Sequence, residues 1–351
     1  NFLDKNSRPA YTERRVDFLP CYFHEVPNLL RTGGFPIDVA IVQVSRPNEE
    51  GYCSFGVSCD YTKCAAEVAP IVIAEVNKQM PFIGGDNLIH VTKLDYIVPV
   101  DRPLVEIPPA PIGEGEQRIG EICAELIEDG DTLQIGIGAI PDAVLQCLQG
   151  RKDLGLHTEM FTDGVMHMIQ SGHVTGEKKT LHHRKVASSI IMGSKALYDF
   201  IDHNEMIEMY PVHHMNDPYV IGQNDRMVSI NSCLEIDLYG QVASEAIGLE
   251  QFSGTGGQVD YLRGAKRSRG GRSILAFTST AKGGTVSRIV PVLPPGATVT
   301  SGRNEVDYIA TEYGAVRLRG LTLRERALAL VSIAHPDFRP GLMAAIEERF
   351  S

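Results

Sequence analysis

The chain has 351 residues, more than one average domain, which predicts two domains. Its hydrophobic fraction of 43% and charged fraction of 22% are ordinary for a globular protein, and no apolar run is long enough to span a bilayer. The net charge of −11 argues against nonspecific binding to nucleic acid.

The first hundred residues alternate between strand-like and helix-like segments. Residues 36–44, 71–74 and 96–100 are rich in β-branched side chains and predict strands. Residues 26–31 and 62–68 have a helical pattern. This alternation predicts an α/β layer in the N-terminal part of the chain.

A proline-rich stretch follows at residues 103–115, with four prolines and two glycines. Such a stretch forms neither a long helix nor a central strand. We therefore predict an N-terminal domain at 1–102, a linker at 103–115 and a C-terminal domain at 116–351. The chain starts at Asn1 rather than Met, which leaves a targeting segment upstream an open question.

A strand–glycine loop–helix unit is predicted next. Apolar residues at helical spacing predict a helix at 116–127, and 132–136 reads as a strand. Pro141 then opens a helix at 142–148. The remaining predicted elements are strands at 187–192, 206–210, 227–230 and 273–277 and a terminal helix at 341–350.

Two glycine-rich loops stand out. Gly136 and Gly138 follow a predicted strand and precede a helix, a context that favours anion binding by backbone N–H groups. Pro141 stands where a dinucleotide fingerprint needs its third glycine, so that motif is excluded. The glycines within 254–257 would let the backbone approach a ligand closely. A ligand-free turn at the first loop and a hairpin at the second remain alternatives.

One carboxylate lies between these loops in the sequence. The stretch 156–164 sets Glu159 between a predicted strand end and a loop that closes on Gly164. A nucleophile is one interpretation, and a first-turn helix acid or a salt-bridge partner is the other. The basic run 263–272 suits a phosphate-bearing small molecule or a solvated turn equally well.

The metal-ligating residue types lack the spacing of a metal site. The seven cysteines form no C-x-x-C pair and predict reduced thiols, as in a cytosolic compartment. The pairs His182-His183 and His213-His214 are adjacent rather than four residues apart. We interpret them as loop or core histidines and predict no metal.

Taken together, these motifs resemble the family I CoA-transferases, in particular the acetyl-CoA hydrolase/4-hydroxybutyrate CoA-transferase branch. The resemblance runs from near residue 16 to near the C-terminus, and the stretches that carry it are 157–164, 229–242, 252–260, 283–291 and 311–314. It implies two related open α/β domains with the active site between them, the first domain being incomplete at its start. It also implies a glutamate that forms acyl and CoA esters, which the His-Thr-Glu-x-x-x-Asp-Gly motif maps onto Glu159.

The resemblance assigns roles to further residues. The N–H groups of Gly256 and Gly257 would stabilise the oxyanions formed as Glu159 reacts with a thioester. Asn231 and Gln258 would orient carboxylates, and Lys282 and Arg288 would hold a CoA phosphate or an acid substrate, unless they form structural ion pairs. The predicted coenzyme-binding residues are Gln134, Ile135, Gly136, Ile137, Gly138, Gly257 and Lys282.

Three functions follow from this interpretation. The first is transfer of CoA between an acyl-CoA and a small carboxylic acid such as acetate, as in butyrate or 4-hydroxybutyrate metabolism. The second is hydrolysis of an acyl-CoA, and the third is a non-catalytic CoA-binding subunit. The resemblance favours transfer by a cytoplasmic homodimer or homotetramer. Its substrates would be acyl-CoA and small acids, with no permanently bound cofactor, no metal, no nucleic acid and no membrane partner.

Overall fold

The computed structural model describes residues 2–350, and its N-terminal part contains a small parallel sheet. The strands β1 (Val39–Val44), β3 (Ile71–Asn77) and β6 (Tyr96–Val100) lie in the order β1-β3-β6. Helices α2 (Val26–Arg31) and α3 (Thr62–Val68) pack together beside it, and α3 contacts β1. The face of β1 that carries Ala40, Val42 and Val44 forms a separate core.

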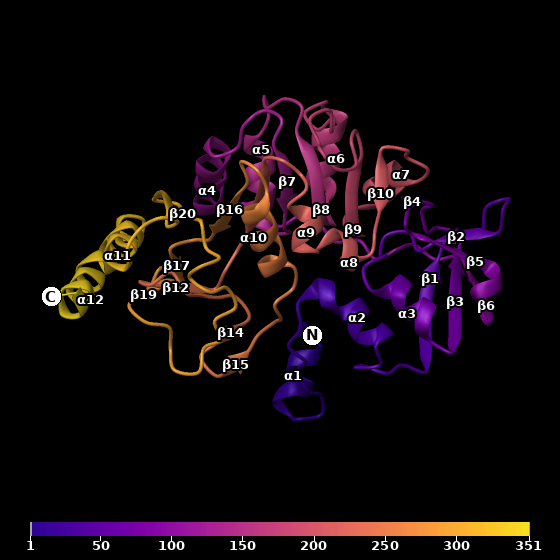
Figure 1. Ribbon diagram of the computed structural model, residues 1–351, viewed down its shortest axis with the longest axis horizontal. Coiled ribbons are helices and arrows are strands. Elements are labelled where there is room, and N and C mark those ends of the chain that lie inside the picture. The colour runs from indigo at the N-terminus through magenta and orange to yellow at the C-terminus, as the bar shows by residue number, and fades with distance from the viewer. Residues whose placement is uncertain (1, 351) are drawn as a thin grey trace.

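A larger sheet of nine strands forms the centre of the molecule (Figure 1). Its order is β21-β20-β16-β11-β7-β8-β9-β10-β4, and all neighbours are parallel except β20 and β21. The strands are β4 (Gly84–Gly85), β7 (Thr132–Ile135), β8 (Gly155–Phe161), β9 (Val186–Ile191), β10 (Ile207–Met209), β11 (Met227–Asn231), β16 (Arg272–Ala276), β20 (Tyr308–Thr311) and β21 (Gly314–Arg317). Because β4 comes from the N-terminal part, the two parts are joined through this sheet.

The strand order determines which helices share a face. From β7 to β10 the chain moves in one direction, so right-handed crossovers put α5 (Ala139–Cys147), α6 (Asp163–Gln170) and α7 (Lys195–Ile201) on one face. The chain then returns to β11 and moves the opposite way. The same rule puts α8 (Val212–Met215), α9 (Pro218–Ile221) and α10 (Gln258–Arg267) on the other face. The reversal makes the carboxyl ends of β7 and β11 the switch point where α/β sheets bind ligands.

Smaller elements complete the C-terminal part. Strands β12 (Glu235–Asp237), β13 (Val242–Ala243) and β19 (Ile289–Val290) form a three-stranded sheet. Strands β14 (Ala246–Ile247) and β15 (Glu250–Gln251) pair as a hairpin, as do β17 (Thr280–Ala281) and β18 (Val286–Ser287). Helix α11 (Leu323–Ser332) begins with a capping box and packs against α12 (Arg339–Phe350). The remaining elements are α1 (Ser7–Thr12), η1 (Phe23–Glu25), the pair β2 (Tyr52–Ser54) and β5 (Leu88–His90), η2 (Val91–Lys93), α4 (Glu114–Glu125) and η3 (Pro336–Phe338).

The predicted α/β class is confirmed, and most predicted elements are present. The bounds of α2, α3 and β6 agree with the predicted ones. Helix α4 begins two residues earlier than predicted, and α5 begins directly after Gly138, with Pro141 in its first turn. The domain boundaries themselves stay a prediction.

The predicted local structure around Glu159 is wrong in one respect. The predicted strand end and loop are instead a continuous strand, because β8 runs through Glu159 to Phe161. Gly164 lies inside α6, whose N-cap is Thr162. As a central strand of a parallel sheet, β8 is buried on both faces and lacks the alternation that marks a half-exposed strand.

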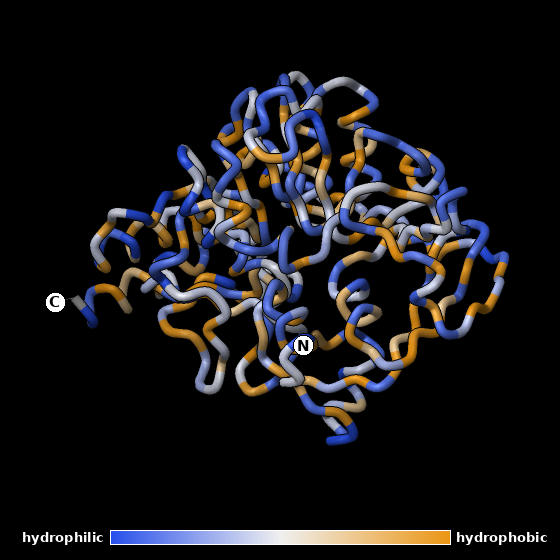
Figure 2. Tube along the Cα trace, turned by 45° about the vertical axis from the view of Figure 1, so that its right-hand side comes forward, coloured by the Kyte–Doolittle hydropathy of each residue, from blue (hydrophilic) through white to orange (hydrophobic). Residues whose placement is uncertain are grey.

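The distribution of apolar and polar residues agrees with the layered arrangement of the sheet and its helices. Apolar stretches run through the central strands, while hydrophilic stretches dominate the loops at the periphery (Figure 2). Among residues 2–350, no helix combines the length and the apolar character needed to cross a membrane. All seven cysteines are free thiols.

Candidate active site

Glu159 lies on the face of the central sheet that carries α8 and α10. Its carboxylate contacts Asn216, whose Nδ2 donates a hydrogen bond to Oε2 over 2.6 Å. Asn216 directly follows α8 and is fully buried. The Glu159 carbonyl accepts a bond from the Ser188 hydroxyl over 3.0 Å, which ties β8 to β9. One oxygen of the carboxylate is therefore held by a buried amide.

The second glycine loop closes on the same carboxylate. Gly257 is the N-cap of α10, and a Cβ built there would overlap both Glu159 Oε2 and Asn216 Nδ2. Gly256 has a φ of +52°, a left-handed conformation that favours glycine. The loop thus brings backbone and the N-terminal end of a ten-residue helix against Glu159, where a helix stabilises negative charge.

The surroundings make Glu159 a stronger base than a surface glutamate. Burial raises its pKa from 4.5 to about 7, and the charges of Asp260 and Asp60 add to the rise, while the Asn216 hydrogen bond opposes it. The raised pKa keeps more of this carboxyl group protonated near neutral pH than in a surface glutamate. The carboxylate is also only partly hydrated, which favours reaction with an electrophile.

Two contacts from the N-terminal part reach this site. The Asp60 carbonyl accepts a bond from Val212 N over 3.0 Å and so holds the start of α8. His24 Nδ1 lies 2.7 Å from a carboxylate oxygen of Asp260, which is fully buried on α10. Burial lowers the pKa of His24, but the hydrogen bond and charge of Asp260 outweigh it and the net pKa is raised. Glu159 therefore lies where the N-terminal part meets α8 and α10.

The first glycine loop lies at the switch point of the sheet. Gln134 and Asn231, at the ends of β7 and β11, exchange two amide hydrogen bonds of 3.1 and 2.9 Å. Gly138 has a φ of +112° and open space around its Cα, and Ile137 is 56% exposed. Ile135 is buried at the end of β7. The loop is free to face a ligand.

The predicted orienting residues bond to other groups. The Asn231 amide pairs with Gln134, and the Gln258 amide donates to the hydroxyls of Ser244 and Ser301 over 2.9 and 3.0 Å. No sequence pattern predicts a role for Asn216, which contacts Glu159. It follows a four-residue helix that has no periodicity, and its partner is 57 residues away.

The cations predicted to bind phosphate differ in whether they are bonded within the fold. The Arg288 guanidinium donates to backbone oxygens of Leu234 and Cys233 and is held within the fold. Lys282 is exposed on the β17–β18 hairpin and forms no ion pair with any residue in 2–350. The run 263–272 is tied down by ion pairs, since Arg263 and Lys266 contact Glu305, and Arg272 contacts the buried Asp131. Residues 263–267 lie in α10 and Arg272 begins β16, so only residues 268–271 lie between elements as the predicted solvated turn would.

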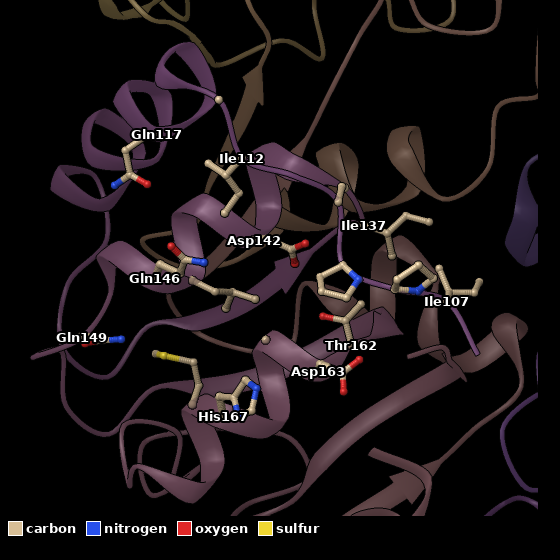
Figure 3. Close-up of a pocket in the computed structure, with 18 of the residues that line it drawn as sticks. Ile107, Ile112, Gln117, Ile137, Asp142, Gln146, Gln149, Thr162, Asp163 and His167 are labelled. Carbon is tan, nitrogen blue, oxygen red and sulfur yellow. The ribbon is translucent and has the colours of Figure 1, made fainter. Parts of the chain in front are cut away.

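A large cavity lies on the other face of the sheet, with a volume of about 1520 Å³. The proline-rich segment crosses it at Ile107 and Ile112, and α4, α5 and α6 form its walls (Figure 3). It reaches the first glycine loop at Ile137 and Gly138. The cavity does not include Glu159, although it adjoins the carboxyl edge of the same sheet.

The paired histidines lie in loops and short helices, where His182, His213 and His214 are half-buried and His183 is exposed. His182 Nε2 lies 2.9 Å from His214 Nε2, beside the ring of Tyr210. Burial lowers the pKa of both His182 and His214. Within the described part of the chain, no three His, Cys, Asp or Glu side chains converge as metal ligands.

Two protein-family models match the chain. The acetyl-CoA hydrolase/transferase N-terminal domain matches residues 1–109, and the corresponding C-terminal domain matches residues 193–346. The 4-hydroxybutyrate coenzyme A transferase of Clostridium kluyveri is 56% identical over 99% of this chain and 81% of its own length. A succinyl-CoA:cyclohexane-1-carboxylate CoA transferase of Geobacter metallireducens is 46% identical over 98% of this chain and 78% of its own length.

Solved structures agree with these matches. The crystal structure of a 4-hydroxybutyrate CoA-transferase from Porphyromonas gingivalis is 62% identical, with a TM-score of 0.88 over 99% of this chain and 84% of that one. RipA from Yersinia pestis is 40% identical, with a TM-score of 0.92 over 98% of this chain and 78% of that one.

Among the sequence relatives, an acetyl-CoA hydrolase of Yarrowia lipolytica is more distant, at 24% identity over 89% of this chain and 66% of its own length.

Proposed function

The chain belongs to the acetyl-CoA hydrolase/transferase family, and on this premise we propose that it transfers CoA between an acyl-CoA and a small carboxylate through an ester of Glu159. The observation that carries this proposal is the environment of Glu159. A carboxylate with a pKa of about 7 lies between a buried amide and the glycine N-cap of a helix. The names of the relatives support 4-hydroxybutyrate, butyrate and acetate as acids to test.

The proposed reaction consists of two half-reactions, and atoms and charge are conserved in each. A carboxylate oxygen of Glu159 attacks the thioester carbonyl, the C–S bond breaks, and a mixed anhydride and a CoA thiolate form. The thiolate then attacks the glutamyl carbonyl, which gives a glutamyl-CoA thioester and releases the first acid as a carboxylate. The second acid repeats these steps in the opposite order, so CoA leaves on the new acyl group.

Each residue has a role that its contacts support. The backbone N–H groups at Gly256, Gly257 and the start of α10 would stabilise the oxyanions, and Asn216 would orient the Glu159 carboxylate. Residues 134–138 at the switch point would bind CoA, which is consistent with the open space at Gly138. Lys282 would contribute a phosphate contact from its exposed position.

Product analysis with one acyl-CoA tests the proposal. Butyryl-CoA is mixed with acetate, and CoA esters and free thiol are followed by mass spectrometry and a thiol reagent. We expect acetyl-CoA to replace butyryl-CoA with little free CoA. The Glu159→Gln variant is the control and should form no acetyl-CoA. Free CoA that equals the butyryl-CoA consumed, with or without acetate, would indicate a hydrolase, and no reaction would indicate a binding subunit.

A further inference from the structure

His157 is a buried residue of the catalytic motif to which the proposed reaction gives no role. It precedes Glu159 by two residues on β8, so both side chains project from the same face of the strand. Its side chain is fully buried, and Nε2 lies 2.9 Å from the backbone oxygen of Met215. Because a carbonyl only accepts, the proton is assigned to Nε2, which donates this bond.

The Met215 carbonyl is held from a second side. The buried Tyr261 hydroxyl donates to it over 3.1 Å. The next residue, Asn216, is fixed through its own N–H, which bonds to Val212 O over 2.9 Å. Its side chain then reaches Glu159. Two donors on one carbonyl thus determine the plane of the peptide bond from which the Asn216 side chain extends.

The environment of His157 keeps it in a single protonation state. Burial lowers its pKa well below the ordinary value, and the charge of Lys179 acts in the same direction, while the hydrogen bond to Met215 opposes the shift. Nδ1 has no hydrogen-bond partner within residues 2–350. A second proton on Nδ1 would therefore create a buried donor without an acceptor. His157 remains a neutral donor over the pH range in which Glu159 ionises.

We propose that His157 is a positioning residue for the nucleophile, because its Nε2–H bond fixes the Met215–Asn216 turn and aims the Asn216 amide at Glu159. This inference rests on the proposed function of Glu159. Without the His157 bond, the turn relaxes and the carboxylate loses an oriented donor. We therefore expect kcat to fall and the pKa of Glu159 to rise, while the affinity for acyl-CoA stays unchanged.

Three variants test this role. His157→Gln reaches far enough to put an amide N–H near the former Nε2, His157→Asn offers the same amide on a shorter arm, and His157→Phe keeps the ring without a donor. We expect kcat to fall about tenfold in the Asn and Phe variants with KM unchanged, and to recover most of its value in the Gln variant. Equal losses in the Gln and Asn variants, with equally lowered melting temperatures, would overturn the proposal.

A measurement without turnover separates this inference from the proposed function. The Glu159 carboxyl is titrated by infrared difference spectroscopy against Glu159→Gln in each background. Asp60 and Asp260, the acids that face Glu159, are unchanged in all variants. We expect the midpoint to rise by about one pH unit in the Phe and Asn variants, since the Asn216 bond favours the ionised form. An unchanged midpoint overturns the proposal. If the wild type transfers no CoA, the proposed function fails and this titration alone decides the role of His157.

Discussion

The two glycine loops differ in what makes glycine necessary. A Cβ at Gly257 would overlap the Glu159 carboxylate and the Asn216 amide, so this glycine is required by the side chains packed against it. A Cβ at Gly138 meets nothing within 4 Å, but its φ of +112° disfavours any other residue. One loop is closed on the proposed nucleophile, and the other faces open space at the switch point of the sheet.

From this difference we expect the second loop to affect the chemical step and the first loop to affect binding. The closed loop contacts the groups that would react, so a change there should act on kcat. The open loop borders a cavity of about 1520 Å³ and has room for a ligand, so a change there should act on KM. This cavity and the carboxylate of Glu159, whose pKa is raised, lie on opposite faces of the sheet. The cavity by itself therefore does not point to the proposed nucleophile.

The largest effect is expected for Gly257→Ala. The added methyl displaces Glu159 or Asn216 and disturbs the N–H groups at the start of α10. We expect kcat to fall by about two to three orders of magnitude, as when an oxyanion donor is removed. Steady-state kinetics with butyryl-CoA and acetate measure it, and a thermal melt verifies folding. A raised KM with an unchanged kcat would mean that this loop only binds CoA.

A smaller and different effect is expected for Gly138→Ala. The methyl meets no atom, but the backbone at a φ of +112° must shift to accept it. We expect KM for acyl-CoA to rise about tenfold while kcat stays within about threefold, since only a binding loop moves. The same kinetic assay decides this. A loss of kcat as large as that of Gly257→Ala would remove the distinction between the loops.

The closed environment of Glu159 also predicts a pH effect on stability. Its folded-state pKa of about 7 lies above the ordinary 4.5, so folding favours the protonated acid. The contribution of Glu159 to the free energy of unfolding is greatest below about pH 4.5, where the group is protonated in both states. It decreases as the pH rises towards 7 and is constant above that. Glu159→Gln removes this loss, so we expect the stability of the variant relative to the wild type to rise by about 3 kcal/mol between pH 4.5 and pH 8. Denaturant unfolding at pH 4.5 and 8 measures it, and an equal difference at both values would contradict the raised pKa.

The smallest effect is expected for Lys282→Ala. This exposed lysine would contribute one screened phosphate contact, worth about 0.5 kcal/mol. We expect KM for acyl-CoA to rise about twofold at low salt and less at high salt. A KM that matches the wild type at every salt concentration would remove Lys282 from the CoA site.

The sequence predicts elements well where one face is apolar and poorly where partners are distant. Helices α2 and α3 have the predicted bounds because their pattern is local. The sequence predicts a strand end near Glu159, whereas β8 continues to Phe161. A strand buried on both faces can carry Thr158 and Glu159 without the alternation that marks a strand in the sequence.

The sequence points to only part of the candidate site. Its motif singles out Glu159 and the glycines of the second loop, whose roles stay predictions. Asn216 lies in a short stretch of turns, and only the fold brings it to a residue 57 positions earlier. The roles of Asn231 and Gln258 were inferred from residue type, and their amides bond elsewhere once the side chains are packed.

The most direct test of the account is to trap the intermediate on the enzyme. The protein is incubated with butyryl-CoA without an acceptor acid, treated with borohydride or hydroxylamine, digested and mapped by mass spectrometry. We expect a reduced or hydroxamate side chain at Glu159 alone, and none in the Glu159→Gln variant. A modification at another residue, or turnover with no trapped adduct, would contradict the glutamyl-CoA intermediate.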